Sequence, residues 1–113
     1  MKFSNAMSLS LLSLLAAPAL GCLETIGSID VQGNVDTSIT RVIDNGLVVC
    51  NAAWGWRVDQ DNHVSLNCLA NYIYAVTKDG ATAWYRNPVN AFSFTQSVSA
   101  GGSSFWWDDH HFC

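Results

Sequence analysis

The sequence predicts a small α+β domain, with one antiparallel sheet of five or six strands and one short helix on a face of that sheet. Residues 64–95 alternate between turn residues and segments rich in β-branched and aromatic side chains, which is typical of an antiparallel meander. Residues 36–45 instead carry apolar side chains at helical spacing. Four cysteines in so short a chain indicate that disulfides supplement a small hydrophobic core.

Residues 1–19 are predicted to form a secretion signal peptide. Lys2 supplies the positive start, residues 7–16 the apolar run, and residues 17–19 a cleavage site flanked by small side chains. The apolar run is shorter than the roughly 20 residues of a transmembrane helix. We therefore expect residues 20–113 to be a single secreted, disulfide-stabilised domain without a membrane span. A lipoprotein acylated at Cys22 is the alternative, although the residues before Cys22 match the usual lipoprotein motif poorly.

The four cysteines of residues 20–113 allow three pairings, and we favour the nested one. A Cys22–Cys113 bridge would tie the two ends of the domain together. A Cys50–Cys68 bridge would join two segments that are expected to pair as strands. Because no Cys-x-x-Cys spacing occurs, we predict no zinc site at these residues and no cofactor.

The predicted strands begin with residues 22–31, whose loose alternation directs Leu23, Thr25, Ile29 and Val31 inward. An Asp-Gly pair and an Asn-Pro pair provide the later turns of the meander. Residues 96–100 are expected to leave the sheet for a loop at residues 101–104. The remaining strands are predicted at residues 47–50, 54–58, 63–69, 71–77, 81–86, 91–95 and 105–113.

The helix is predicted over residues 36–45. Asp36 or the threonine after it can accept hydrogen bonds from the first turn, and an Asn-Gly pair at the end offers a left-handed stop. The apolar stripe consists of Ile39, Val42 and Ile43. A strand over residues 37–42 is the alternative, because threonine, isoleucine and valine also favour strands.

The charge balance excludes some partners. Of the five lysines and arginines, Lys2 lies in the signal peptide, so four basic residues stand against nine carboxylates. A nucleic-acid-binding protein needs a basic surface to neutralise phosphates, and a polybasic membrane-binding surface has the same need. We therefore predict no nucleic-acid partner.

The enzymatic alternative is a small secreted ribonuclease-like enzyme. Glu24, the only glutamate, could act with His63 or His110 as general acid and base, and Arg57 or Arg86 could hold the phosphate. The acidic composition opposes a polyanionic substrate, and no nucleophilic hydrolase motif occurs. The sequence therefore favours a protein without catalytic residues.

Residues 108–111 form the most polar cluster of the chain. On a strand, Asp108 and His110 would share one face, while Asp109 and His111 would share the other. With His63, two residues on one face could hold a divalent ion. A solvated strand end explains the cluster more simply, so we predict no metal site.

The surplus of aromatic residues suggests a binding surface. Trp54 and Trp56 would project from the same side of an extended segment, with Arg57 at the rim. Tryptophan and tyrosine are enriched at binding hot spots because they are large, stiff and amphipathic. The alternative is that the aromatic residues fill the core. A carbohydrate-binding module that uses the tryptophan pair is a further possibility.

The layout of the chain resembles the small, secreted, cysteine-framed effector-like proteins of filamentous fungi. The signal peptide opens with Met-Lys-Phe-Ser and ends near Ala-Pro-Ala, Cys22 begins the domain, Cys113 closes it, and two cysteines lie between. The resemblance implies a compact fold that acts on host plants or competing microbes, and it assigns no functional residue. We therefore expect a monomeric, extracellular effector or toxin-like protein that binds a host or competitor protein or glycan.

Overall fold

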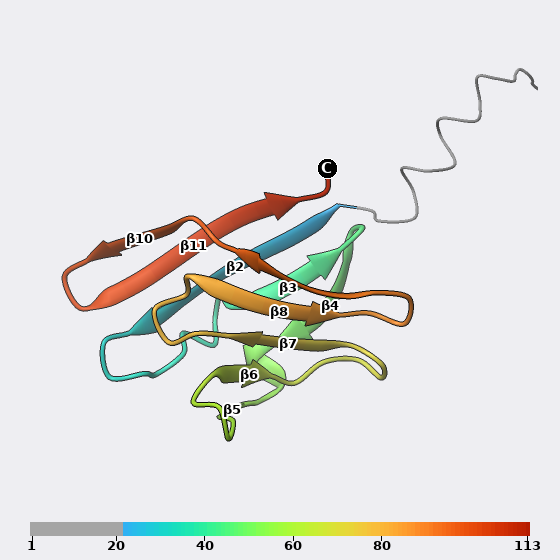
Figure 1. Ribbon diagram of the computed structural model, residues 1–113. Helices are drawn as coiled ribbons and strands as arrows, with labels where there is room; N and C mark the ends of the chain where they lie inside the picture. The colour runs from blue at the N-terminus through green and yellow to red at the C-terminus, as the bar shows by residue number, and fades with distance from the viewer. Residues whose placement is uncertain (1–21) are drawn as a thin grey trace, which may run out of the picture.

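Two five-stranded antiparallel sheets face each other in the structure, a computed structural model that describes residues 22–113 (Figure 1). The strand order is β10-β11-β2-β3-β4 in the first sheet and β5-β6-β7-β8-β9 in the second. From residue 22 onward, the chain forms β2 to β4 of the first sheet, then the whole second sheet as a meander, and then returns to the first sheet beside β2. The predicted signal peptide, residues 1–19, lies outside the described residues.

The strands are short in the second sheet and longer at the centre of the first. The first sheet contains β2 (Leu23–Asp30), β3 (Arg41–Asp44), β4 (Leu47–Asn51), β10 (Val98–Gly101) and β11 (Ser104–His111). The second contains β5 (Trp56–Val58), β6 (Val64–Leu66), β7 (Ile73–Val76), β8 (Thr82–Arg86) and β9 (Ala91–Thr95).

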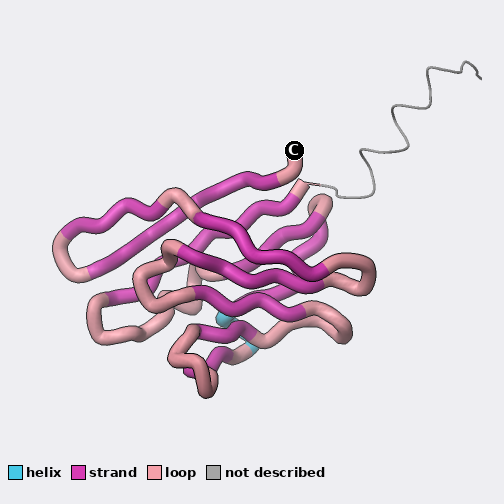
Figure 2. The backbone as a smooth tube through the Cα atoms, viewed as in Figure 1, coloured by secondary structure: helices cyan, strands magenta, loops and turns pink. Residues whose placement is uncertain are grey.

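The predicted α+β class with a single sheet is wrong. The ten strands divide into two sheets, and residues 22–113 contain no α-helix. Their only helical element is the 3₁₀ turn η2 (Ala52–Trp54), where the chain passes from the first sheet to the second (Figure 2). Each sheet is too small to bury its apolar face alone, so the two faces cover each other.

The segment predicted as a helix forms one turn followed by the β3–β4 hairpin. Asp36 does act as a cap, because its carboxylate accepts the Ser38 amide at 3.0 Å, but only this one turn follows. Thr40 and Val42 are then buried at a spacing of two residues, and β3 pairs with β2 and β4. The Asn-Gly pair at residues 45–46 has positive φ at both positions, which suits a tight hairpin turn as well as a helix end.

The predicted meander is confirmed over β6 to β9. Consecutive strands pair antiparallel throughout. Gly80 has a φ of 80° in the turn before β8, and the Asn87 side chain accepts the Val89 and Asn90 amides at 2.9 and 2.7 Å in the turn before β9. The turn residues recognised in the sequence therefore perform their expected roles.

The first strand is confirmed with one error, and one strand was missed. Leu23, Thr25 and Ile29 are buried on the inner face of β2, but Val31 lies beyond the strand and is 63% exposed. Residues 98–101 form β10, where the sequence predicted a departure from the sheet. Strand β10 pairs along its whole length with β11, so cross-strand pairing rather than side-chain pattern makes it a strand.

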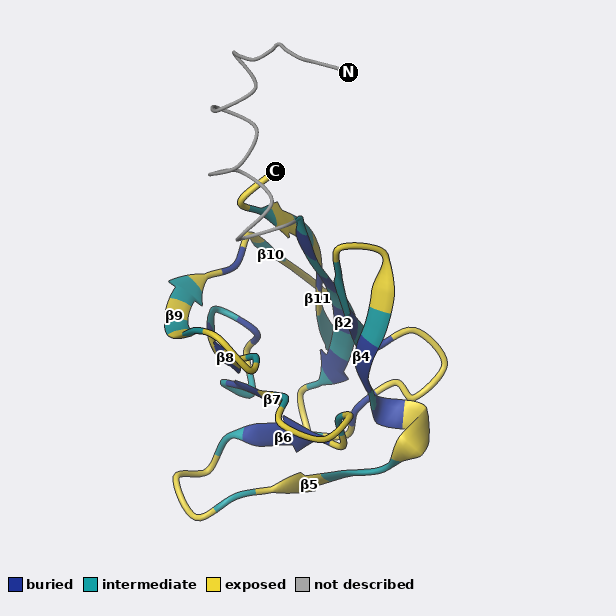
Figure 3. Ribbon diagram, turned by 90° about the vertical axis from the view of Figure 1, so that its right-hand side faces the viewer, coloured by how far each residue is buried: buried dark blue, intermediate teal, exposed yellow. Residues whose placement is uncertain are grey.

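The core lies between the two sheets, and buried residues occur in strands of both layers (Figure 3). Trp107 of β11 is 2% exposed. Its indole ring packs directly against Gly27 and Gly80, where a Cβ atom would lie 2.6 Å from the ring, so both positions need glycine. Tyr85 of β8 donates a hydrogen bond to the Asp44 carboxylate of β3 across the same interface.

The two disulfides have the nested pairing favoured from the sequence. Cys22–Cys113 joins the ends of β2 and β11, which pair over eight residues of each strand. Cys50–Cys68 links β4 to the segment after β6, where the two cysteines also form an isolated β-bridge. The second bridge therefore connects the two sheets.

Candidate functional site

The outer face of the first sheet combines an exposed indole ring with carboxylates. Because side chains alternate along a strand, β11 directs Trp106, Asp108 and His110 outward, while Trp107, Asp109 and His111 point toward the second sheet. Opposite them on β2, the outward residues are Glu24, Ile26 and Ser28.

A groove of about 680 Å³ crosses this face at Trp106. The turn between β10 and β11 forms one wall, and the loop between β2 and β3 forms the other. Trp106 itself is 45% exposed. The side chains that line the groove beside it include Ile26, Ser28, Asp36, Ile39, Ser104 and Asp108.

Glycine makes room for the Trp106 ring against β10. A Cβ atom at Gly101 would lie 3.2 Å from the ring, and the backbone of Gly102 turns through a φ of 60° beside it. The indole can therefore lie against the strand backbone and present its other surface to solvent.

Asp36 contributes a fixed negative charge to the wall of the groove. Its Oδ1 atom accepts hydrogen bonds from the Ser38 hydroxyl at 2.6 Å and from the Ser38 amide at 3.0 Å. The hydroxyl hydrogen bond is the main cause that lowers the pKa of Asp36, so this carboxylate stays ionised down to acidic pH. Its Oδ2 atom accepts no hydrogen bond within the described residues.

Beyond the groove, the register of β11 and β2 brings Glu24 and His110 together. The two residues are directly opposite each other, and His110 Nε2 lies 3.2 Å from Glu24 Oε2. Asp108 lies on the same face, so that one ligand atom from each of these three residues lies within 4.8 Å of the others. The set could chelate a divalent ion, as could Asp59, Asp61 and His63 in the loop between β5 and β6.

The residues of the ribonuclease hypothesis are only partly brought together. Glu24 and His110 meet on the outer face of the first sheet. His63 lies in the loop before β6 of the second sheet, and its ring stacks on Trp84 with the centroids 4.3 Å apart. Arg57 and Arg86 are exposed on strands of the same second sheet. The structure therefore separates the candidate acid–base pair from both candidate phosphate-binding arginines.

The predicted binding residues Trp54, Trp56 and Arg57 do not share one face. Trp54 lies in η2 and is 46% exposed. Trp56 is partly buried and packs against the core, whereas Arg57, the next residue of β5, is exposed and points to the opposite side. The aromatic residues thus divide between core and surface, and Trp106 is an exposed tryptophan that lies in a groove.

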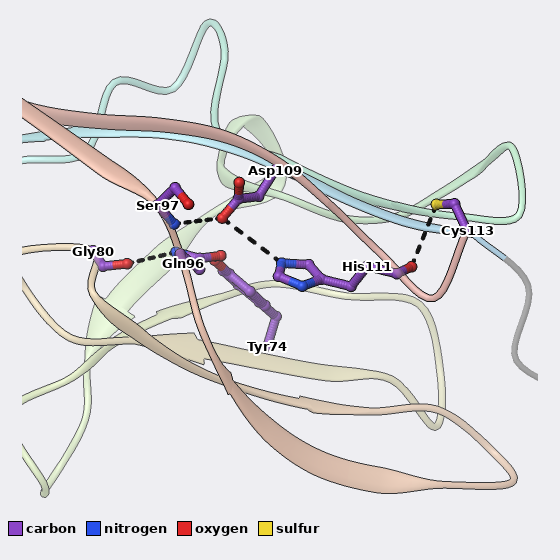
Figure 4. Close-up of polar contacts among 7 residues, drawn as sticks. All are labelled: Tyr74, Gly80, Gln96, Ser97, Asp109, His111 and Cys113. Carbon is purple, nitrogen blue, oxygen red and sulfur yellow. Dashed lines mark hydrogen bonds and ion pairs between the residues drawn. The ribbon is translucent and has the colours of Figure 1, made fainter.

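A separate polar cluster lies between the sheets (Figure 4). Tyr74 donates to Gln96 at 2.8 Å, Gln96 donates to the Gly80 carbonyl at 2.6 Å, and Asp109 accepts the Ser97 amide. The His111 imidazole lies 3.9 Å from the Asp109 carboxylate, too far for a hydrogen bond. These contacts join the sheets where the chain passes from β9 to β10, which indicates a structural role.

No helix within residues 22–113 is long and apolar enough to cross a membrane. No protein-family model, curated protein or solved structure shows significant similarity to this chain.

Proposed function

We propose that the protein is a secreted, non-enzymatic effector or toxin-like protein that acts outside the cell or in a host by binding a partner molecule in the Trp106 groove. Two disulfides are compatible with an extracellular location. The observation that carries the proposal is the exposure of an indole ring in a groove that also offers carboxylates and hydroxyls. Ligand sites commonly combine an apolar surface with a few well-placed polar groups.

The ribonuclease-like alternative receives less support. A phosphate-transferring site needs a cation close to its acid and base. Glu24 and His110 lie on the outer face of the first sheet, whereas Arg57 and Arg86 belong to the second. The inner faces of the two sheets meet in the core, so the outer faces point away from each other. Binding without catalysis therefore fits the arrangement better.

Cell-surface binding by purified protein tests the proposal. Fluorescently labelled protein should bind to plant cells or to fungal or bacterial competitors, and Trp106→Ala should reduce that binding by about tenfold or more. Trp54→Ala is the matched control, because Trp54 is exposed to the same extent, 46% against 45% for Trp106, but lies outside the groove.

The outcome with the two variants is decisive. Binding that is lost in Trp106→Ala and kept in Trp54→Ala supports the groove. Absence of binding to every cell type, or equal binding by wild type and Trp106→Ala, would show that the groove is not the functional surface. Circular dichroism spectra should show that both variants keep the wild-type fold.

A further inference from the structure

We propose that the ligand of the Trp106 groove is a neutral glycan, an inference that rests on the proposed function and names its ligand class. The groove pairs one exposed indole ring with two carboxylates and three serine hydroxyls, and none of its lining residues is a lysine or arginine. Three properties of a neutral sugar chain match this arrangement: an apolar ring face, hydroxyl donors, and the absence of negative charge.

The indole ring of Trp106 provides the surface on which a sugar ring can stack. One face of a pyranose consists of C–H groups, which gain dispersion energy against a flat aromatic ring. Gly101 allows the Trp106 ring to lie against β10, so the ring is supported on one side and 45% of the residue remains exposed. Because the ring is already in place, binding costs little side-chain entropy.

Hydrogen-bonding side chains share the groove with the Trp106 ring. Asp108 follows Trp106 by two residues on the same face of β11, and Ser28 lies directly opposite Trp106 on β2. Asp36 offers its Oδ2 atom from the facing wall. Carboxylate oxygens are strong acceptors for hydroxyl groups, and a neutral polyol supplies those donors in abundance.

Charge and size separate this ligand from the other candidates. An anionic glycan or nucleic acid would bring negative charge against Asp36 and Asp108, and the lining contains no lysine or arginine. Arg41, which lies beside the groove, donates to the Ile39 carbonyl at 3.5 Å. A stable protein partner typically contacts about 20–30 residues on each side, whereas twelve residues line this groove. The groove volume of about 680 Å³ falls in the range of about 300–1,000 Å³ that is usual for small-ligand sites.

Titration calorimetry with defined oligosaccharides tests the inference. The probes are neutral hexasaccharides of β-1,4-glucose, β-1,3-glucose, β-1,4-N-acetylglucosamine, β-1,4-xylose and β-1,4-mannose, with oligogalacturonate and chitosan oligomers as anionic and cationic controls. We expect at least one neutral hexasaccharide to bind and the anionic control not to bind. Trp106→Ala should weaken the affinity about tenfold or more, Trp106→Phe less, and Trp54→Ala not at all.

Three results would overturn the inference: no binding of any neutral hexasaccharide, binding of the cationic or anionic oligomer alone, or neutral binding that Trp106→Ala leaves unchanged. The cell assay separates failure of this inference from failure of the proposed function. If cell binding depends on Trp106 but is abolished by treating the cells with protease and resists competition by every oligosaccharide, the groove binds a protein. In that case the proposed function stands and the glycan is wrong.

Discussion

Tyr74 and Gln96 form a buried hydrogen-bonded pair where the chain returns to the first sheet. Tyr74 is 1% and Gln96 4% exposed, and Gln96 also donates to the Gly80 carbonyl. Gln96→Leu would leave the tyrosine hydroxyl and the glycine carbonyl without partners. We expect the free energy of unfolding to fall by about 2–4 kcal/mol, because each buried unpaired group costs about 1–3 kcal/mol. Urea unfolding followed by tryptophan fluorescence measures the change.

The same pair allows a test of coupling. Tyr74→Phe removes the donor and leaves the Gln96 carbonyl oxygen without its hydrogen bond. The double variant Tyr74→Phe with Gln96→Leu should lose less stability than the sum of the single losses. The reason is that the tyrosine hydroxyl, which Gln96→Leu alone leaves unpaired, is absent from the double variant. Strictly additive losses would show that the 2.8 Å hydrogen bond contributes nothing of its own.

His111 makes the stability depend on pH. Burial, reinforced by the nearby His110 and opposed by Asp109, lowers the pKa of His111 from its ordinary value of 6.5. Between the lowered pKa and 6.5 the unfolded chain binds more protons than the folded one, so the free energy of unfolding decreases as pH falls through this window. The contribution of His111 is complete well above pH 6.5, decreases through this window, and is fully lost only below the lowered pKa.

His111→Phe tests this dependence, because phenylalanine keeps a ring against Phe94, whose centroid lies 4.2 Å from that of His111, but cannot take up a proton. We expect the wild-type melting temperature to fall between about pH 7.5 and about pH 5, and the variant to show a smaller decrease over the same range. Parallel melting curves would contradict a role for His111.

At the scale of secondary-structure elements, Gly46 lies in the turn between β3 and β4, where the sequence predicted the end of a helix. Its φ is 86°, and a Cβ atom there would meet no other atom within 4 Å. Gly46→Ala should therefore lower the free energy of unfolding by about 1 kcal/mol through backbone strain alone. Asn45→Gly, at the neighbouring position with a φ of 51°, is the control and should be neutral or nearly so. An unchanged stability of Gly46→Ala would contradict the role of backbone strain at this position.

The wrong helix prediction over residues 36–45 shows that the local sequence pattern alone does not distinguish a helix from a strand here. Ile39, Val42 and Ile43 fit a helical stripe, but burial of Thr40 and Val42 follows the two-residue period of a strand. Capping by Asp36 and the Asn-Gly turn are compatible with both structures. Pairing with the adjacent strand β4 and with the more distant β2 settles the choice, and neither partner strand can be recognised from the pattern of residues 36–45. The strands of the meander were predictable because their turns and their alternation agree.

The candidate site was also only partly predictable: the sequence indicates which residues of β11 share a face, but not which loops form the groove. Alternation alone places Asp108 and His110 on one face and Asp109 and His111 on the other, as the structure has them. The same alternation also places Trp106 on the face of Asp108, so the sequence itself contains a signal for this site. The walls of the groove could not be predicted, because Asp36 comes to line the same groove as Trp106 only through the course of the loop after β2.

At the scale of the whole molecule, the two disulfides hold different parts of the fold. Cys22–Cys113 closes a loop of 91 residues between neighbouring strands of one sheet, and Cys50–Cys68 closes a loop of 18 residues between the two sheets. Because a longer loop restricts the unfolded chain more, replacing the first pair by alanine should lower the free energy of unfolding by about 4–5 kcal/mol and replacing the second by about 3 kcal/mol.

Urea unfolding of the two double variants, Cys22→Ala with Cys113→Ala and Cys50→Ala with Cys68→Ala, gives the comparison. The expected ranking follows from loop length alone. The opposite ranking would mean that native contacts at Cys50, which is fully buried in the core between the sheets, outweigh the entropy of the unfolded chain. The stability of this small protein would then depend chiefly on how its two sheets are joined, rather than on how its ends are closed.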